Sequence, residues 1–313
     1  MSKKVLVLGA SGEIGGRIAR GCVDAGYQVT GVTRGANARH QVDLSGIEFL
    51  VGDKYDEAFY ESELATREFD VIIDSVPFME DAVLAHKHFA GRIEHYFVCG
   101  STGSYTPLQY IPGDENHPWR EDTGINFFEQ CERDAQLLAW REEDGFPATV
   151  FRSSCICGIG RCPIETWGGR NPHYYRLMKQ NEPLEIPGDG KVLLQAGCND
   201  DIAAAFVLGA GKGDEIAGEI FNISARRAVT LTHWFNTAKD ILGSTSTAEY
   251  MSLEALCKRR PDDASARWTG FLMEHMAFDM TKAEEMLGYK PQYTMEQGLE
   301  RALSWLLDAG QIT

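Results

Sequence analysis

The sequence predicts an α/β protein with a doubly wound parallel sheet and a small, discontinuous C-terminal domain. Val5 to Leu8 form a short continuous apolar run, as expected for a parallel strand buried on both faces. The run leads through a glycine-rich turn into a segment with Ile14, Ile18 and Ala19 at helical spacing. Four further strand-like segments alternate with helix-like segments up to residue 105. Such alternation is typical of a Rossmann-type sheet.

The turn after the first strand carries Gly9, Gly12 and Gly15 at the spacing G-x-x-G-x-x-G. Between a strand and a helix, this spacing indicates a dinucleotide site. Gly9 permits a tight turn, Gly12 lets the backbone approach a pyrophosphate, and Gly15 lets the helix pack on the strand. The free amides at the start of the helix then face the phosphates. The simpler alternative is a strand, turn and helix without a ligand.

The end of the second predicted strand, Gln28 to Val32, indicates which dinucleotide binds. NAD sites usually place an acidic residue here, on the ribose 2′-hydroxyl. This chain has Thr33-Arg34-Gly35, with Arg39 close behind. Arginine pairs well with a 2′-phosphate, so we expect NADP, with NAD as the alternative. The competing interpretation of Arg34 is a solvated loop residue.

The remaining elements follow from hydrophobic periodicity. In the first half we expect strands and helices in the order Ile47 to Val51, Tyr55 to Glu68 (an acidic helix), Phe69 to Asp74, Met79 to Ala90 (a helix), His95 to Cys99, and Ala148 to Cys155 (the sixth strand). In the second half we expect helices at Asn171 to Gln180, Asp200 to Leu208, Thr230 to Leu242, Thr281 to Leu287 and Met295 to Leu307, with a strand at Glu219 to Ile223.

Composition limits the classes of partner. The 313 residues include 30 basic and 46 acidic ones, a net charge of −16, which disfavours binding to nucleic acid. No run of about 18 apolar residues is present, so we expect no membrane partner. Met1-Ser-Lys-Lys leads directly into a strand without a cleavage site, which favours a cytoplasmic location. The eight cysteines are then expected to be reduced thiols.

A metal site is not expected. Cys155, Cys157 and Cys162 with His173 are the set that comes nearest to one, but their spacing matches no zinc pattern. Cys155 and Cys157 are two residues apart on a predicted strand, which places both on one face. Packing in the core is therefore favoured over metal binding.

Several further motifs extend along the chain. They are Gly52-Asp53, Ser101-Thr-Gly-Ser-Tyr105, Phe151-Arg152, Gly158, Ile186-Pro-Gly-Asp-Gly190, Asp200-Asp-Ile-Ala203, Phe221-Asn-Ile-Ser224, Phe278-Asp-Met-Thr-Lys282, Leu287-Gly-Tyr-Lys-Pro291 and Gly298-Leu299. Together with the glycine turn, they make the chain resemble an extended or atypical short-chain dehydrogenase/reductase of the NAD-dependent epimerase/dehydratase kind. Residues 151–243 are most similar to the chloroplast stem-loop-binding branch and its bacterial relatives.

The resemblance implies two domains and a set of cofactor contacts. Residues 1–168 and about 192–243 would form the dinucleotide-binding domain, and about 169–191 with 244–313 the substrate domain. The implied cofactor-binding residues are Gly9, Ser11, Gly12, Glu13, Ile14, Gly15, Arg34, Asp53, Lys54 and Ser75. A homodimer through the helices at Met79 to Ala90 and Phe127 to Glu143 is also implied.

The family's catalytic pattern is broken in this chain. The family uses a serine, matched by Ser101, and a Tyr-x-x-x-Lys pair about 25 residues later. Phe127 occupies the tyrosine position and Cys131 the lysine position. Phenylalanine has no titratable proton and a neutral thiol holds no ribose as an ammonium does. Tyr105, Cys131 and Glu129 are the alternative acids, with packing as the competing interpretation of Tyr105 and the favoured one of Cys131.

The substrate would lie against Thr102 and the segment His173-Tyr174-Tyr175-Arg176. Aromatic faces beside an arginine suit a sugar, a nucleotide or an aromatic ring, while the simpler alternative is a helix that packs its aromatics on the domain. We therefore expect an NAD(P)-dependent oxidoreductase or epimerase acting by hydride transfer on a small-molecule substrate, sugar-like or otherwise hydroxylated. The alternative is a non-catalytic NADP(H)-binding sensor or scaffold.

Overall fold

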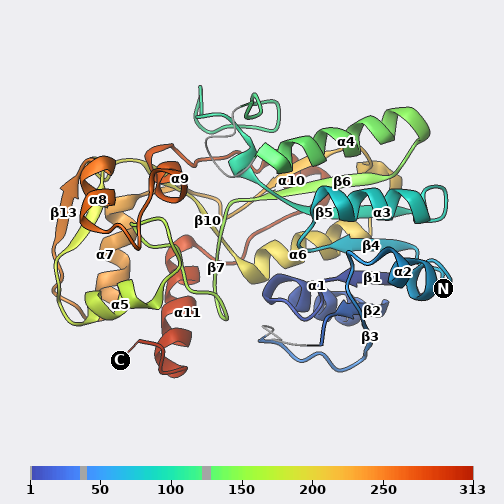
Figure 1. Cartoon of the computed structure of the whole chain (residues 1–313), viewed down its shortest axis with the longest axis horizontal. Coiled ribbons are helices and arrows are strands. Elements are labelled where there is room, and N and C mark those ends of the chain that lie inside the picture. The colour runs from blue at the N-terminus through green and yellow to red at the C-terminus, as the bar shows by residue number, and fades with distance from the viewer. Residues whose placement is uncertain (1, 36–40, 122–127, 313) are drawn as a thin grey trace.

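A computed structural model describes residues 2–35, 41–121 and 128–312 and is organised around a seven-stranded parallel sheet (Figure 1). The strand order is β11-β6-β5-β4-β1-β2-β3, so the chain starts inside the sheet, moves to one edge and then crosses back. The strands are β1 (Lys4–Leu8), β2 (Gln28–Thr33), β3 (Ile47–Val51), β4 (Val71–Asp74), β5 (His95–Ser101), β6 (Ala148–Ser153) and β11 (Ile220–Ile223). The predicted Rossmann-type sheet is confirmed.

Helices cover both faces of this sheet. Both faces of the sheet are apolar and need a cover, as β1 shows: its side chains alternate between two separate cores. Val5 and Val7 pack in the core beneath α1 and α6, whereas Leu6 and Leu8 pack in the core beneath α3 and α4. The helices are α1 (Glu13–Asp24), α6 (Asn199–Ala210), α3 (Met79–Phe89) and α4 (Phe128–Asp144). The sheet and these helices form what we call the first lobe.

The second lobe lies beyond the carboxyl ends of the central strands and has a core of its own (Figure 1). Three small two-stranded sheets and several helices surround this core. The elements are β7 (Cys155–Cys157), α5 (Pro172–Lys179), β8 (Leu184–Pro187), β9 (Leu193–Leu194), β10 (Ala196–Cys198), β12 (Val229–Thr230), α7 (Leu231–Ile241), β13 (Ala248–Met251), α8 (Leu253–Arg259), α9 (Ala266–Thr269) and α11 (Met295–Asp308). Among the described residues, no helix has the length and apolarity needed to cross a membrane.

Two predicted elements differ from the structure. The helix expected from Tyr55 to Glu68 is a short α2 (Glu57–Phe59) followed by the π-helical turn η1 (Tyr60–Leu64). The wider turn accompanies burial of Tyr60 and Leu64 beneath α3. The sixth strand is divided because the chain leaves the central sheet after Ser154, whose amide bonds to the Ile223 carbonyl. It then pairs with β10 as β7.

The packing of two helices also differs from the predicted division into domains. Trp234 and Phe235 of α7 lie in the core of the second lobe, although residues up to 243 were expected in the first. Conversely, Ala283 and Leu287 of α10 (Thr281–Leu287) pack against the central sheet. Each helix joins the core that its apolar face contacts. The other domain boundaries stay a prediction.

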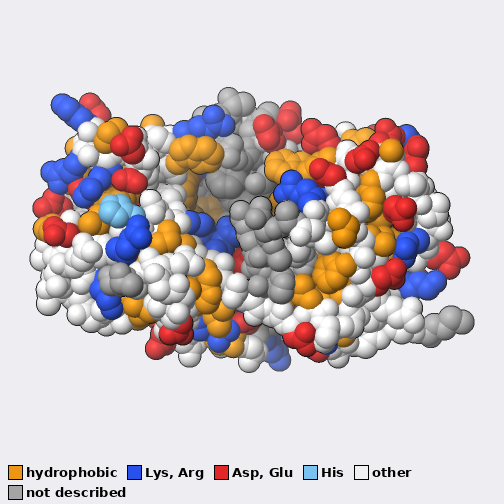
Figure 2. Space-filling model, turned by 60° about the horizontal axis from the view of Figure 1, so that its bottom comes forward, with side chains coloured by type: hydrophobic (Ala, Val, Ile, Leu, Met, Phe, Trp, Pro, Cys, Tyr) orange, Lys and Arg blue, Asp and Glu red, His pale blue; other side chains and the backbone are white. Residues whose placement is uncertain are grey.

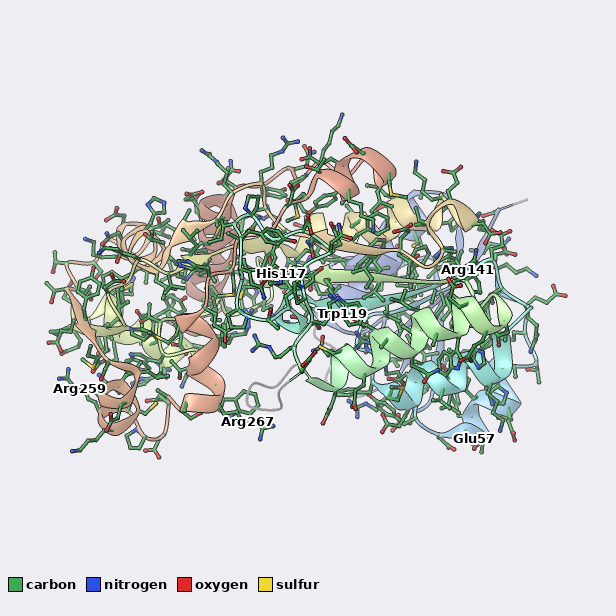
Figure 3. The ribbon with its side chains drawn as sticks, turned by 90° about the horizontal axis from the view of Figure 1, so that it is seen from above. Glu57, His117, Trp119, Arg141, Arg259 and Arg267 are labelled. Atoms are coloured by element: carbon green, nitrogen blue, oxygen red, sulfur yellow. The ribbon has the colours of Figure 1, made fainter. Side chains whose placement is uncertain are left out.

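The eight cysteines form no disulfide. Cys157 lies in the core of the second lobe and Cys155 packs against it, in agreement with the core interpretation of both thiols. Within the described ranges, one group of three side chains is close enough together to hold a metal ion: Glu57, Glu61 and His88. Glu57 lies at the end of the first lobe, far from where the lobes meet (Figure 3).

Candidate functional site

Two cavities meet where the lobes face each other. A cleft of about 1020 Å³ follows the carboxyl edge of the central sheet, and a pocket of about 510 Å³ lies between that edge and the second lobe. Figure 2 shows the hollow between the two halves, with Lys and Arg side chains around it. Both cavities are lined by Ser101, Ser153, Ile156, Arg161 and Arg170. Molecules bound in the cleft and in the pocket would therefore touch.

The glycine turn forms one end of the cleft. Gly9 has a φ of 81°, and the Gly12 amide bonds to the Gly9 carbonyl at 2.8 Å. A Cβ atom on Gly15 would lie 2.2 Å from the Gly9 oxygen and 2.8 Å from the Oγ of Ser75, so only glycine fits. Helix α1 begins at Glu13, directly after Gly12, and has no side-chain cap. Its first amides are thus available to an anion, as a dinucleotide pyrophosphate requires.

Three other expected cofactor residues lie along the same edge of the sheet. Ser11, Arg34 and Asp53 follow β1, β2 and β3, whose carboxyl ends are adjacent. The Oγ of Ser11 accepts a hydrogen bond of 2.7 Å from Thr33, and Arg34 is exposed. Arg39 lies outside the described residues. These positions agree with a 2′-phosphate or 2′-hydroxyl site, whose role stays a prediction.

Lys54 does not contact the cleft, contrary to the expectation that it binds the cofactor. Its Nζ donates hydrogen bonds to Asp74 at 2.9 Å, to Asp81 at 2.8 Å and to the Val76 carbonyl. An ammonium has three donors, so all of them are used inside the protein. Burial and the charge of Asp74 raise the pKa of Asp81 to about 7. Lys54 therefore stabilises two buried carboxylates.

Ser101 lies in the position expected of it, at the end of β5. Its Oγ accepts a hydrogen bond of 3.1 Å from the Gly103 amide, which leaves the hydroxyl proton for a ligand. Thr102 is buried and lines the smaller pocket. Ser153 lies opposite Ser101 on β6, and its hydroxyl donates to the Gly100 carbonyl at 3.2 Å. The end of β5 thus presents a hydroxyl at the junction of the two cavities.

Tyr105 contributes a ring to the pocket wall, but its hydroxyl is turned inward. The hydroxyl donates to the Oδ1 of Asn222 at 2.9 Å, and the Arg152 guanidinium lies 4.7 Å from the ring centre. Arg152 is held between this ring and that of Trp119, which lies near the middle of the molecule (Figure 3). Burial raises the pKa of Tyr105 to about 12. These contacts favour the packing interpretation of Tyr105 over its use as the replacement for the missing catalytic acid.

Cys131 is also directed away from both cavities. Its thiol, on α4, is buried and donates to the Ser104 carbonyl at 3.3 Å, and burial raises its pKa. The burial and hydrogen bond of the thiol agree with the packing interpretation of Cys131. Glu129, two residues earlier, is exposed and lines the larger cleft. Among the three alternative acids, Glu129 is the one that lines the cleft. Phe127 lies outside the described residues.

The predicted substrate residues of α5 line neither cavity. Tyr174 is buried and shares a hydrogen bond of 2.9 Å with Thr166, and its ring meets that of Trp167 edge-on. His173 and Arg176 lie on the same helix, outside both lining sets. Tyr174 agrees with the packing interpretation, because the amphipathic helix turns its aromatic face into the core of the second lobe, while substrate roles for His173 and Arg176 stay a prediction.

Other aromatic side chains take their place in the pocket. Trp268, Phe271 and Phe278 line it, and Trp268 is 56% exposed. Trp268 was not among the predicted substrate residues, although a tryptophan in a polar segment was a usable signal. The pocket is also basic, with Arg120, Arg161 and Arg170 against one acidic side chain, Glu274, which pairs with Arg120 at 2.7 Å.

Comparison with known families agrees with this geometry. The NmrA-like family matches residues 1–96, and the NAD dependent epimerase/dehydratase family matches residues 79–224. The two matches together span the glycine turn, Ser101 and the junction of the cavities. The predicted resemblance to the NAD dependent epimerase/dehydratase family is thus confirmed over residues 79–224.

Individual relatives cover nearly the whole chain. The chloroplast stem-loop binding protein of 41 kDa b from Arabidopsis thaliana is 26% identical over 323 residues, covering 99% of this chain and 80% of its own. The UDP-glucose 4-epimerase structure from Thermotoga maritima has a TM-score of 0.77 at 19% identity, covering 98% of this chain and 99% of that one. A dTDP-glucose 4,6-dehydratase from Bacillus anthracis in complex with NAD has a TM-score of 0.76 at 19% identity, covering 98% and 97%.

A nicotinamide dinucleotide fits the residues present. The glycine turn leaves no room for a Cβ atom at Gly15, and the amides at the start of α1 face the cleft without a side-chain cap. The cleft also extends from this turn to Ser101, so one long ligand spans both. The preference for NADP over NAD stays a prediction that depends on Arg34.

Proposed function

We propose that this chain is an NAD(P)-dependent oxidoreductase or epimerase-type enzyme acting on a sugar-like or small hydroxylated substrate. The observation that carries the proposal is that Ser101 lines both the cleft and the pocket. When bound, the dinucleotide supplies a hydride acceptor or donor. The Ser101 hydroxyl would hydrogen-bond the substrate oxygen and hold its carbon at the junction of the cavities.

The lining of the pocket supports a sugar-like substrate with a negative charge. Trp268 and Phe271 offer apolar faces to a sugar or base ring. Arg161 and Arg170 offer positive charge in a protein whose net charge is −16. A small sugar carrying a phosphate, a carboxylate or a nucleotide satisfies both features.

Proton transfer needs a group other than the family's tyrosine. We assign it to Glu129, because this residue lines the cleft while the Tyr105 hydroxyl and the Cys131 thiol form hydrogen bonds inside the protein. In oxidation of a carbinol, the hydride would leave with the cofactor and the hydroxyl proton would pass to the carboxylate. Reduction runs the same transfers backward.

A non-catalytic NADP(H)-binding sensor or scaffold is the second candidate. The inward-facing Tyr105 hydroxyl favours it, because the usual acid and base are then replaced only by Glu129. A cytoplasmic location and a homodimer through α3 and α4 belong to either candidate. We infer no nucleic-acid partner, because the net charge of −16 opposes polyanion binding.

The first experiment is to denature the purified chain and identify any released nucleotide by mass and absorbance. Stoichiometric NAD(P) that survives purification would favour an epimerase or dehydratase with an internal redox cycle. Reversible NADPH binding to an empty site would favour a reductase or a sensor. If no nucleotide is released and NADPH does not bind, the dinucleotide site is refuted.

Variants then test the catalytic assignment against a panel of nucleotide sugars. We expect Ser101→Ala and Glu129→Gln each to lower kcat by about 100-fold, the usual effect of losing one transition-state contact. Tyr105→Phe is the matched control, since its hydroxyl bonds only inside the protein, and should change kcat less than about threefold. Unchanged turnover in both Ser101→Ala and Glu129→Gln would place the reaction elsewhere.

A further inference from the structure

Arg161 and Glu13 both line the cleft, and each has a buried polar side-chain atom without a hydrogen-bond partner. The Nε of Arg161 is buried without a hydrogen-bond partner, and so is the Oε2 of Glu13. The Nη1 of Arg161 lies 3.5 Å from that oxygen, an ion pair rather than a close hydrogen bond. Buried polar atoms without partners are costly, so a ligand that satisfies them gains affinity.

The loop that carries Arg161 is fixed over the start of α1. The Nδ2 of Asn199 and the Nη2 of Arg17 both donate to the Ile159 carbonyl, at 2.9 and 2.8 Å. Asn199 also donates to the Oε1 of Glu13. A Cβ atom on Gly160 would lie 3.6 Å from the Cγ of Glu13. The loop therefore places Arg161 opposite the uncapped amides of the glycine turn.

Arg170 adds a second positive charge at the same place. Its Nη1 donates to the carbonyls of Ile156 and Cys162, at 2.8 and 2.9 Å, which holds the guanidinium at the junction of the cavities. Burial and the charge of Arg170 lower the pKa of Arg161, although an arginine stays protonated. Arg161 and Arg170 thus place two positive charges at the junction of the cavities, and that of Arg161 is ion-paired with Glu13.

We propose that Arg161, supported by Arg170, binds a phosphate group opposite the glycine turn and gives up its contact with Glu13 to do so. A planar guanidinium matches two phosphate oxygens and forms stronger hydrogen bonds with them than with neutral acceptors. The proposal rests on the dinucleotide site proposed above. The phosphate is the cofactor's pyrophosphate or a substrate phosphate, since both arginines line both cavities.

NADPH titration followed by fluorescence tests the cofactor as the source. Arg161→Gln removes one charge-assisted contact and should raise the Kd about 10- to 100-fold. Arg67→Gln is the matched control, because Arg67 is also 36% exposed and ion-paired, with Glu48 at 2.8 Å, but lies outside the cleft. The Kd of the Arg67→Gln variant for NADPH should equal that of the wild type.

Glu13→Gln should change the Kd for NADPH in the opposite direction to Arg161→Gln. Removing the carboxylate beside the phosphate site should lower the Kd for NADPH several-fold, because Arg161 then has no competing anion. A variant that merely damages the fold would weaken binding instead. Thermal unfolding of all the variants checks that they fold like the wild type.

A second titration distinguishes the two phosphate sources. UDP-glucose is titrated by calorimetry into wild type and Arg161→Gln, each saturated with NADPH. Weaker binding of UDP-glucose, with unchanged NADPH affinity, would assign Arg161 to a substrate phosphate. Unchanged binding of both probes would overturn the proposal. A wild-type chain that binds no NADPH would refute the dinucleotide site itself, and with it this role of Arg161.

Discussion

Replacing Asp81 with asparagine removes one buried charge from the cluster around Lys54. Asp81 and Asp74 are both fully buried, and their carboxylates lie 2.8 and 2.9 Å from the same ammonium. The Oδ2 of Asp81 also accepts a hydrogen bond of 2.8 Å from the Phe78 amide, while its Oδ1 has no partner. Two carboxylates thus share one positive charge, and burial together with Asp74 raises the pKa of Asp81 to about 7.

The raised pKa gives the stability a definite pH dependence. In the unfolded chain the carboxyl titrates near its ordinary pKa of about 3.9. Between about pH 4 and pH 7 the folded chain therefore holds more protons than the unfolded chain, and its free energy of unfolding falls as the pH rises. A pKa difference of about three units corresponds to at most about 4 kcal/mol. Asparagine keeps the oxygen acceptor and carries no charge. Position 81 of the variant therefore causes no fall in the free energy of unfolding as the pH rises.

Urea unfolding of both proteins at about pH 5 and about pH 8 measures the effect. The free energy of unfolding of Asp81→Asn, relative to wild type, should rise by up to about 2.6 kcal/mol between the two conditions, because only the interval from about pH 5 to the folded pKa of about 7 is crossed. Glu165, whose pKa burial raises to about 7, titrates in both proteins and cancels from the difference. Asp189→Asn, at an exposed position, should show no such rise. An equal difference at both pH values would mean that Asp81 stays ionised, and would refute the reasoning.

Two further variants test the cofactor site. Arg34→Ala should raise the Kd for NADP about 10- to 100-fold and leave that for NAD nearly unchanged, because only NADP carries the 2′-phosphate; equal effects on both would remove Arg34 from the 2′ site. Gly15→Ala should lower the free energy of unfolding by at least about 3 kcal/mol in urea titrations and weaken NADPH binding, since its Cβ would lie 2.2 Å from the Gly9 carbonyl oxygen. Gly270→Ala, whose Cβ would meet no atom within 4 Å, should be nearly neutral, and a similar loss in both variants would contradict the steric argument.

The predictions from sequence succeeded where the signal was local. The apolar run of β1, the glycine turn and the start of α1 lie within a few residues of one another, and each limits the others. The edge that carries Ser101 followed from the alternation of strands and helices, because parallel strands bring their carboxyl ends together. That Phe127 and Cys131 occupy the positions of the family's acid and base stays a prediction from the sequence.

The predictions failed where the direction of a side chain depends on the tertiary packing of its element. The aromatic residues of α5 were expected in the pocket, but Tyr174 faces the core of the second lobe. Periodicity identifies the apolar face of a helix without saying which cavity or core it meets. Trp268 was missed for the complementary reason, since an exposed aromatic residue in a polar segment interrupts any pattern.

By itself, the sequence determined the Rossmann-type sheet and the glycine turn that suits a dinucleotide. Only the tertiary structure decided which polar groups reach the cavities. The Tyr105 hydroxyl bonds to Asn222, 117 residues away, and Lys54 lies between Asp74 and Asp81, 20 and 27 residues away. A buried polar group takes whichever partner the fold brings to it, because leaving it unpaired costs more than its local sequence preference is worth.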